Sequence, residues 1–350
     1  MRATEPRQSI APELAHVEHA GLSVLEICAG AGGQSYGLEL AGFAHAAAVE
    51  IEPIFADTLR LNRPAWDVVT GDVRELSGRQ YRGIDLLAGG VPCPPFSIAG
   101  KQLGEDDERD LFPAALRLVA ETKPAAVMLE NVRGLAGARF GVYRQRILSE
   151  LYRLGYEPHW QVLNASEFGV PQLRPRFILV ALRQKDARRF QWPQPQDTPP
   201  TVGQVVGDLM AERGWPGAMR WAAGANGIAP TIVGGSKKHG GPDLGPTRAR
   251  AEWLRLGVDG LGIGNEPPGP ELPPGFVPKL TLRMVARLQG FPDDWRFAGL
   301  KTAAYRQIGN AFPPPVAAAV GRSISAAITG RVRVPSRVAG SARELLLQSG

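Results

Sequence analysis

Short apolar runs alternate with helical patterns between Ser23 and Leu182, and most of these runs end in glycine or an acid. The expected strands cover residues 24–28, 46–49, 66–69, 84–88, 126–129 and 177–182. The expected helices cover residues 35–40, 54–62, 111–121 and 143–154. Strands that alternate with helices in this way predict an α/β fold with a doubly wound, mostly parallel sheet.

This rhythm stops near Gln184, and the chain is rich in glycine and proline from there to about Lys279. That stretch is typical of a small irregular domain or a long insertion. Helical patterns return over residues 281–289 and over about 315–327. We therefore expect a first domain over 1–184, a second over 185–280, a return to the first over 281–330, and a weakly basic tail over 331–350.

Composition narrows the class of protein. The chain has 350 residues and two cysteines, too few for a disulfide framework or a zinc cluster, so no metal site is expected. No stretch of 18 apolar residues and no secretory leader is present, which favours a cytoplasmic protein. The net charge is +6, and residues 133–190 alone hold eleven Arg and Lys against four Asp and Glu. Such a basic segment is compatible with a polyanionic partner.

The glycine turn Gly30–Gly33 follows the first expected strand, where a backbone can approach a ligand closely. Ser35 stands where the dinucleotide fingerprint would place its third glycine, which disfavours a nicotinamide enzyme. Glu50 ends the second strand and could accept hydrogen bonds from both ribose hydroxyls, while Asp72 could accept one from an adenine amine. Either acid could instead cap a helix or lie in a solvated loop. Together they favour an adenosine-containing cofactor.

A cysteine lies in the rigid loop Pro92-Cys93-Pro94-Pro95 that follows the fourth expected strand. Glu130 ends the fifth strand, so a thiolate and a carboxyl could act on one ring, the carboxyl protonating a ring nitrogen. Arg174 and Arg176 alternate just before the last strand and would share one face. The alternatives are a buried, inert cysteine and a structural ion pair between the arginines and Glu130.

In this combination and order, the motifs resemble those of the cytosine-C5 DNA methyltransferases, of the bacterial restriction-modification type. The motifs are Glu26–Gly33, Gly89–Ser97, Glu130–Val132, the set Gln172, Arg174 and Arg176, then Arg283–Trp295 and Tyr305–Ala311. They occur in the family's unpermuted order and span about 23–183 and 280–322. By this resemblance, residues 185–280 correspond to the target-recognition domain, and the rest to a Rossmann-like catalytic domain that binds S-adenosylmethionine.

The resemblance implies a mechanism and a set of site residues. A cytosine is flipped out of duplex DNA, Cys93 attacks its C6, and Glu130 contacts N3 and the exocyclic amine. Arg176 holds the O2 oxygen, and Arg174 supports the site. The implied cofactor-binding residues are Ala29, Gly30, Ala31, Gly32, Gly33, Glu50, Ile51, Asp72, Val73, Gly90, Pro92, Asn310 and Ala311. The implied DNA-binding residues are Ser97, Lys101, Gln102, Thr231, Gly234, Gly235, Ser236, Lys237, Lys238 and His239.

Two positions depart from the family's pattern. Pro94 stands where glutamine often follows the catalytic cysteine, and Ile51 replaces an aromatic residue that would stack on adenine. Alternatives from other classes are a tRNA cytosine-C5 methyltransferase and an inactive DNA-binding module. We expect a monomer that associates with the bacterial nucleoid through DNA, and a cognate restriction endonuclease could accompany it.

Overall fold

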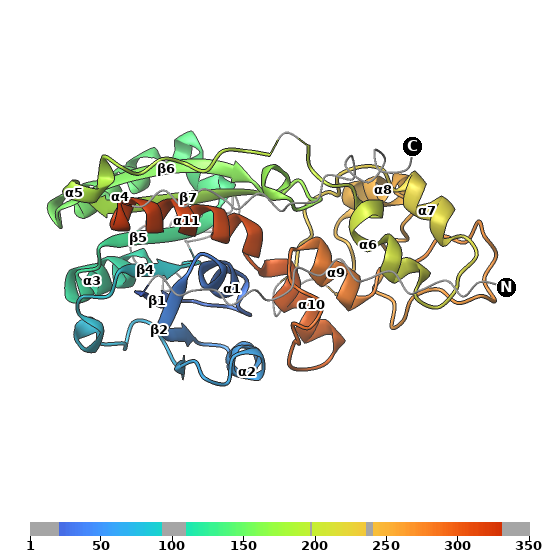
Figure 1. Ribbon diagram of the computed structural model, residues 1–350, viewed down its shortest axis with the longest axis horizontal. Helices are drawn as coiled ribbons and strands as arrows, with labels where there is room; N and C mark the ends of the chain where they lie inside the picture. Colours follow the sequence, from blue (N-terminus) through green and yellow to red (C-terminus); the bar gives the residue numbers. More distant parts are fainter. Residues whose placement is uncertain (1–20, 93–109, 197, 236–240, 331–350) are drawn as a thin grey trace, which may run out of the picture.

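The computed structural model describes residues 21–92, 110–196, 198–235 and 241–330, and its centre is a seven-stranded sheet (Figure 1). The strand order is β3-β2-β1-β4-β5-β7-β6. The strands are β1 (Leu22–Ile27), β2 (Phe43–Glu50), β3 (Val68–Thr70), β4 (Leu86–Gly89), β5 (Ala126–Val132), β6 (Tyr156–Asn164) and β7 (Pro175–Arg183). Strands β1 to β5 pair in parallel, whereas β7 is antiparallel to both β5 and β6. The predicted doubly wound, mostly parallel sheet is thus confirmed.

Helices cover both faces of the sheet, which explains why its central strands are apolar on both sides. One face packs on α1 (Gly33–Leu40) and α11 (Pro314–Thr329), and the other packs on α3 (Phe112–Thr122) and α4 (Gly141–Arg153). Val24 and Leu25 of β1 are both fully buried, one in each of these two cores. The remaining helices are α2 (Pro53–Asn62), α5 (Gln184–Ala187), α6 (Val202–Ala211), α7 (Ala218–Gly224), α8 (Thr247–Arg255), α9 (Leu282–Leu288) and α10 (Lys301–Asn310).

Strand β6 was not expected from the sequence. It includes Pro158 and mixes polar with apolar residues, so it lacks the alternating pattern of a half-buried strand. Its place at the edge of the sheet tolerates the proline, because an edge strand has one unpaired side. The chain then reverses through a short 3-10 turn, Ala165–Phe168, capped by Asn164 and Glu167. This reversal makes β7 antiparallel to its neighbours.

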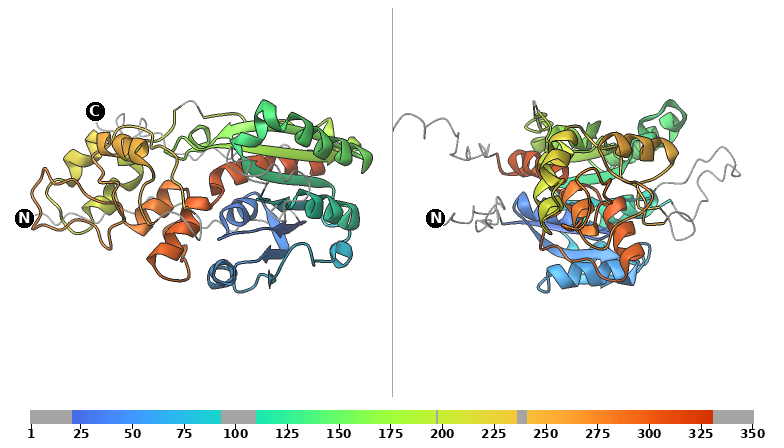
Figure 2. Two further views of the ribbon diagram at one scale, coloured as in Figure 1. Left: turned by 180° about the vertical axis from the view of Figure 1, so that it is seen from behind. Right: turned by 90° about the vertical axis from the view of Figure 1, so that its right-hand side faces the viewer.

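The second half of the chain is more regular than expected. Helices α6, α7 and α8 lie within the stretch that was predicted to be irregular, and α10 was also not expected. Figures 1 and 2 show helices α6 to α10 gathered at the end of the molecule that lies beyond the sheet. A single hydrophobic cluster runs from Val202 to Ala311 and includes the fully buried Trp253. The domain limits at 184 and 280 remain a prediction. Residues 281–311 pack against the preceding helices.

Among the described residues, no helix combines the length and apolarity needed to cross a bilayer.

Gly203 allows α6 and α7 to pack closely, because a Cβ at this position would overlap the carbonyl group of Ala222. We expect Gly203→Ala to lower the free energy of unfolding by roughly 1–3 kcal/mol, since overpacking forces backbone shifts. Gly224→Ala is the matched control, because its Cβ would meet no atom within 4 Å. Urea denaturation of both variants measures the difference, and equal stabilities would contradict this account of the packing.

Candidate active site

The glycine turn after β1 is anchored by the carboxylate that ends β2. Gly30 N–H donates to Glu50 Oε2 at 2.7 Å, and Glu52 N–H donates to Glu50 Oε1 at 2.8 Å. Gly30 and Gly32 have φ values of 59° and 91°, which favour glycine. Burial raises the pKa of Glu50, and the backbone donors from Glu52 and Gly30 oppose that rise. Parallel pairing of β1 with β2 therefore brings the turn and the acid to one edge of the sheet.

Trp295 supports the same turn from the second half of the chain. Its indole Nε1 donates to the carbonyl of Ala31 at 3.1 Å, and a Cβ added to Gly32 would lie 2.6 Å from its ring. Arg63 lies over the Trp295 ring at 5.1 Å and forms a hydrogen-bonded ion pair with Glu39. Local sequence patterns do not indicate this support, because Trp295 is 264 residues from Ala31.

Other expected cofactor residues lie near the carboxyl ends of neighbouring strands. Asp72 follows β3 and pairs with Arg74 at 2.5 Å, and the hydrogen bonds from Arg74 lower the pKa of Asp72. The side chain of Ile51 is 58% exposed, whereas Val73 is buried. Asn310 donates to the carbonyl of Gly235 at 3.2 Å. Ala29 and Ala311 are also buried.

The loop that leads to Cys93 is held on two sides. Asn131 Nδ2 donates to the carbonyl of Val91 at 2.7 Å, and Leu111 N–H donates to the carbonyl of Pro92 at 3.3 Å. A Cβ added to Gly90 would lie 3.3 Å from Glu130 Oε2, so the backbone there passes close to that carboxylate. Asn131 thereby fixes the start of the cysteine loop to the strand that carries Glu130. Its role was not inferred from the sequence.

Glu130 and Arg176 form an ion pair, with 2.9 Å between Oε1 and Nε. Each side chain is 13% exposed, so both charges are largely removed from water. Antiparallel pairing of β5 with β7 sets the contact by placing Val132 opposite Arg176. Burial raises the pKa of Glu130, and the charges of Arg176 and Arg174 oppose this rise. A carboxyl with a raised pKa can share a proton with a bound ring more readily than a solvated one.

Arg174 turns toward the second half of the chain. Its guanidinium donates to the carbonyls of Ile232 at 2.5 Å, Gly309 at 2.9 Å and Ala311 at 2.8 Å. The residue is 1% exposed, and burial lowers its pKa. Its supporting role is therefore to join β7 to two segments of the other half of the protein.

The expected recognition segment packs against the same residues that join β7 to the second half of the chain. Thr231 Oγ1 donates to the carbonyl of Leu173 at 2.5 Å. Gly234 is buried, and a Cβ there would collide with the carbonyl of Arg306 in α10. Its small size thus serves a contact within the protein. Eight expected site residues lie outside the described ranges: Cys93, Ser97, Lys101, Gln102, Ser236, Lys237, Lys238 and His239.

Cys28 has no features of a nucleophile. It lies just before the glycine turn with a φ of 52°, and burial raises the pKa of its thiol, as do the charges of Glu50 and Asp72. A thiol kept protonated in this way is unreactive. Within the described residues, no cluster of three or more His, Cys, Asp or Glu side chains could hold a metal ion.

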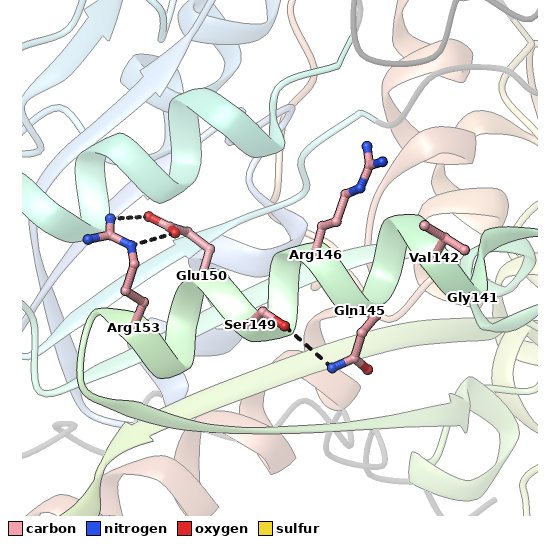
Figure 3. A pocket seen from close by; sticks show the side chains of 7 residues that line it. All are labelled: Gly141, Val142, Gln145, Arg146, Ser149, Glu150 and Arg153. Atoms are coloured by element: carbon pink, nitrogen blue, oxygen red, sulfur yellow. Dashed lines mark hydrogen bonds and ion pairs between the residues drawn. The ribbon is translucent and has the colours of Figure 1, made fainter.

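A shallow hollow of about 570 Å³ lies on the outer side of α4 (Figure 3). It is lined by Gly141, Val142, Gln145, Arg146, Ser149, Glu150 and Arg153. Glu150 and Arg153 pair with each other at one end of it. None of the expected catalytic, cofactor-binding or DNA-binding residues lines this hollow, so it is separate from the site described above.

Comparison with known proteins identifies the family. The model of the C-5 cytosine-specific DNA methylases matches residues 22–229 and 259–326. The chain is 60% identical to the type II methyltransferase M.NaeI of Lentzea aerocolonigenes, over 88% of this chain and 75% of the relative. It is 55% identical to the type II methyltransferase M.NgoMIV of Neisseria gonorrhoeae, over 87% of this chain and 97% of the relative. The chain belongs to the C-5 cytosine-specific DNA methylase family. It is a DNA cytosine-C5 methyltransferase, as its motifs predict.

The fold is also found among solved structures. An E. coli chain described as a DNA modification methyltransferase encoded within a prophage superposes with a TM-score of 0.62 and 24% identity. The match covers 88% of this chain and 99% of that structure. At this level of identity the likeness concerns the fold.

Trp295→Phe tests the support of the glycine turn. The variant keeps an aromatic ring but leaves the Ala31 carbonyl without its donor, so we expect the free energy of unfolding to fall by about 1–3 kcal/mol. Trp160→Phe is the control, because Trp160 is 37% exposed and its ring stacks on Phe177 and Arg144. Denaturant titration compares the two, and an unchanged Trp295→Phe protein would show that the indole hydrogen bond is dispensable.

Proposed function

We propose that this methyltransferase transfers a methyl group from S-adenosylmethionine to C5 of a cytosine flipped out of a specific duplex DNA sequence, within a restriction-modification system. The observation that carries the proposal is the buried Glu130–Arg176 pair beside the loop that leads to Cys93. The glycine turn anchored by Glu50 supports it, because this turn lies at the carboxyl ends of the same parallel strands. Both relatives named above are called type II methyltransferases, which supports the restriction-modification assignment.

In the proposed chemistry, the Cys93 thiol and the buried Glu130–Arg176 pair have separate roles. The thiolate of Cys93 forms a bond to C6 of the flipped cytosine, and electron density moves to C5. Glu130 contacts N3 and the exocyclic amine and limits the charge on the ring, while Arg176 holds O2. When bound, S-adenosylmethionine supplies an electrophilic methyl group. After C5 gains that methyl group, C5 loses its proton, the bond to Cys93 breaks and the ring becomes aromatic again.

The cofactor would bind at the glycine turn. Each carboxylate oxygen of Glu50 accepts one backbone N–H and keeps a further lone pair. The residues therefore suit a ribose whose two hydroxyls donate to this acid. The exposed Ile51 offers an aliphatic contact to adenine, and Asp72 follows β3, the neighbour of β2 in the sheet. Asn310 directly precedes Ala311, whose Cβ lies 3.1 Å from where a Cβ on Gly33 would be.

DNA recognition is assigned to residues 185–280, and most sharply to 226–255. The family model matches up to residue 229 and resumes at 259, so the interval includes the part of the chain that this model leaves unmatched. Gly235 and the following residues 236–239 would contact base edges or phosphates, while Thr231 and Gly234 hold the segment against the rest of the protein. We further propose a monomer that acts on DNA in the bacterial cytoplasm, alongside a restriction endonuclease of the same specificity. The match to the C-5 cytosine-specific DNA methylase model favours a DNA substrate over tRNA.

Covalent catalysis by Cys93 is tested with duplex DNA that carries 5-fluorocytosine at the target. Fluorine cannot leave as the proton does, so the wild-type protein should form a stable adduct with the DNA. Cys93→Ser should form none, and Cys28→Ser should form the adduct because the Cys28 thiol is buried and protonated. Denaturing electrophoresis detects the adduct, and its persistence in Cys93→Ser would refute the assignment.

The role of Glu50 is tested by calorimetry with S-adenosylmethionine. Loss of hydrogen bonds to a charged group costs about 1.5–3 kcal/mol, so Glu50→Gln should weaken binding roughly ten- to a hundredfold. The pKa of Glu50 is raised, so the wild-type carboxylate is protonated at a higher pH than an ordinary glutamate. Affinity should therefore fall as the pH is lowered through that range, and Glu50→Gln should lose this dependence.

The exposed Glu75 supplies the control, since Glu75→Gln should bind with wild-type affinity and keep the wild-type pH profile. Equal affinities of Glu50→Gln and the wild type at neutral pH would mean that Glu50 only anchors the glycine turn.

A further inference from the structure

A segment of the second half of the chain runs alongside the residues that precede β7. Leu173 N–H donates to the carbonyl of Ala229 at 2.8 Å, and Ala229 N–H donates to the carbonyl of Pro171 at 2.8 Å. Thr231 then bonds the carbonyl of Leu173 through its hydroxyl. The segment that we expect to recognise DNA is therefore aligned, residue by residue, with the approach to the catalytic strand.

Two buried side chains hold both peptide groups of Ile232. Gln172 Oε1 accepts its N–H at 2.8 Å, and Arg174 donates to its carbonyl at 2.5 Å. Gln172 is 0% exposed and Arg174 is 1% exposed. A shift of this segment by one residue would leave buried polar groups without partners, which is costly. The two side chains thus define the register at Ile232.

The other end of the Gln172 amide continues the chain of hydrogen bonds. Its Nε2 donates to Gln289 Oε1 at 2.5 Å, at the end of α9. Gln289 Nε2 donates in turn to the carbonyl of Ile308 in α10 at 2.8 Å. Gln289 is also fully buried. Gln172 therefore connects Ile232 to the helices against which the recognition segment packs.

Arg176, one member of the proposed catalytic pair, lies only four residues further along the same stretch of backbone. Arg176 follows Arg174 by two residues and Gln172 by four, and it pairs with Glu130. We propose that Gln172 is a positioning residue for sequence specificity. It sets the register of Thr231–Gly235 relative to Glu130 and Arg176, so that the bases that are recognised determine which cytosine reaches the catalytic pair. This inference rests on the proposed function.

Gln172→Met tests the proposal, because methionine fills a similar volume and removes the hydrogen bonds of the Gln172 side chain, including those with Ile232 and Gln289. Methyl transfer is measured as kcat/KM on the cognate duplex and on duplexes with one changed base pair. Wild-type enzymes of this kind should discriminate by roughly ten- to a hundredfold per changed pair. We expect this ratio to fall about tenfold or more in Gln172→Met. A merely structural loss of active protein lowers all rates equally and leaves the ratio unchanged.

Two further variants separate the causes. Gln172→Asn stays polar but is too short to reach Ile232 N–H, so it should also lose discrimination, and it serves if Gln172→Met does not fold. Gln289→Met leaves the Ile232 contact in place and should retain discrimination. Wild-type discrimination in Gln172→Met or Gln172→Asn would overturn the inference. Absence of cytosine methylation by the wild-type protein on every duplex would instead refute the proposed function.

Discussion

The ion pair between Glu130 and Arg176 depends on how β7 enters the sheet. If β7 were parallel to β5, its carboxyl end would lie at the site instead of Arg176. Because the chain reverses after β6, β7 is antiparallel to β5 and Arg176 lies opposite Val132. The pair is largely buried, so each charge needs the other, and removing one would leave an uncompensated charge. The cysteine loop and the proposed recognition segment connect to the strands that form this pair, or to the residues just before β7. The glycine turn follows β1, which β4 separates from β5.

The residues just before Arg176 carry a second function, because they join the two halves of the protein. Arg174 and Gln172 bond to Ile232, to α10 and to the end of α9, and almost none of their surface reaches water. Buried polar groups of this kind cost free energy unless every partner is in place, so they favour one relative placement over nearby alternatives. The same short stretch can therefore position the proposed catalytic arginine and the proposed recognition segment together.

Local sequence patterns predicted the site residues that lie within or just after a single strand. The glycine turn after β1, Glu50 at the end of β2 and Glu130 in β5 were recognisable because each signal lies within a few residues, and the structure brings them to one edge of the sheet. Glu130 was expected to end its strand, but β5 continues to Val132 because it pairs with β7. Trp295 and Gln172 lie in the motifs, but their contacts were not predicted, since their partners lie far away in sequence. Helix α6 was missed because Gly203 and Gly207 weaken its helical pattern, although a Thr201 capping box begins it. The glycines are there for packing against α7, which only the fold reveals.

The central claim is that Glu130 and Arg176 act as one unit in the methyl-transfer step. A double-mutant cycle with Glu130→Gln and Arg176→Met, followed by single-turnover methylation of cognate duplex DNA, tests it directly. If the pair acts as a unit, the double variant should be about as slow as the slower single variant, because the second substitution removes a group that has already lost its partner. If the two rate losses multiply in the double variant, the residues act independently and the claim is contradicted.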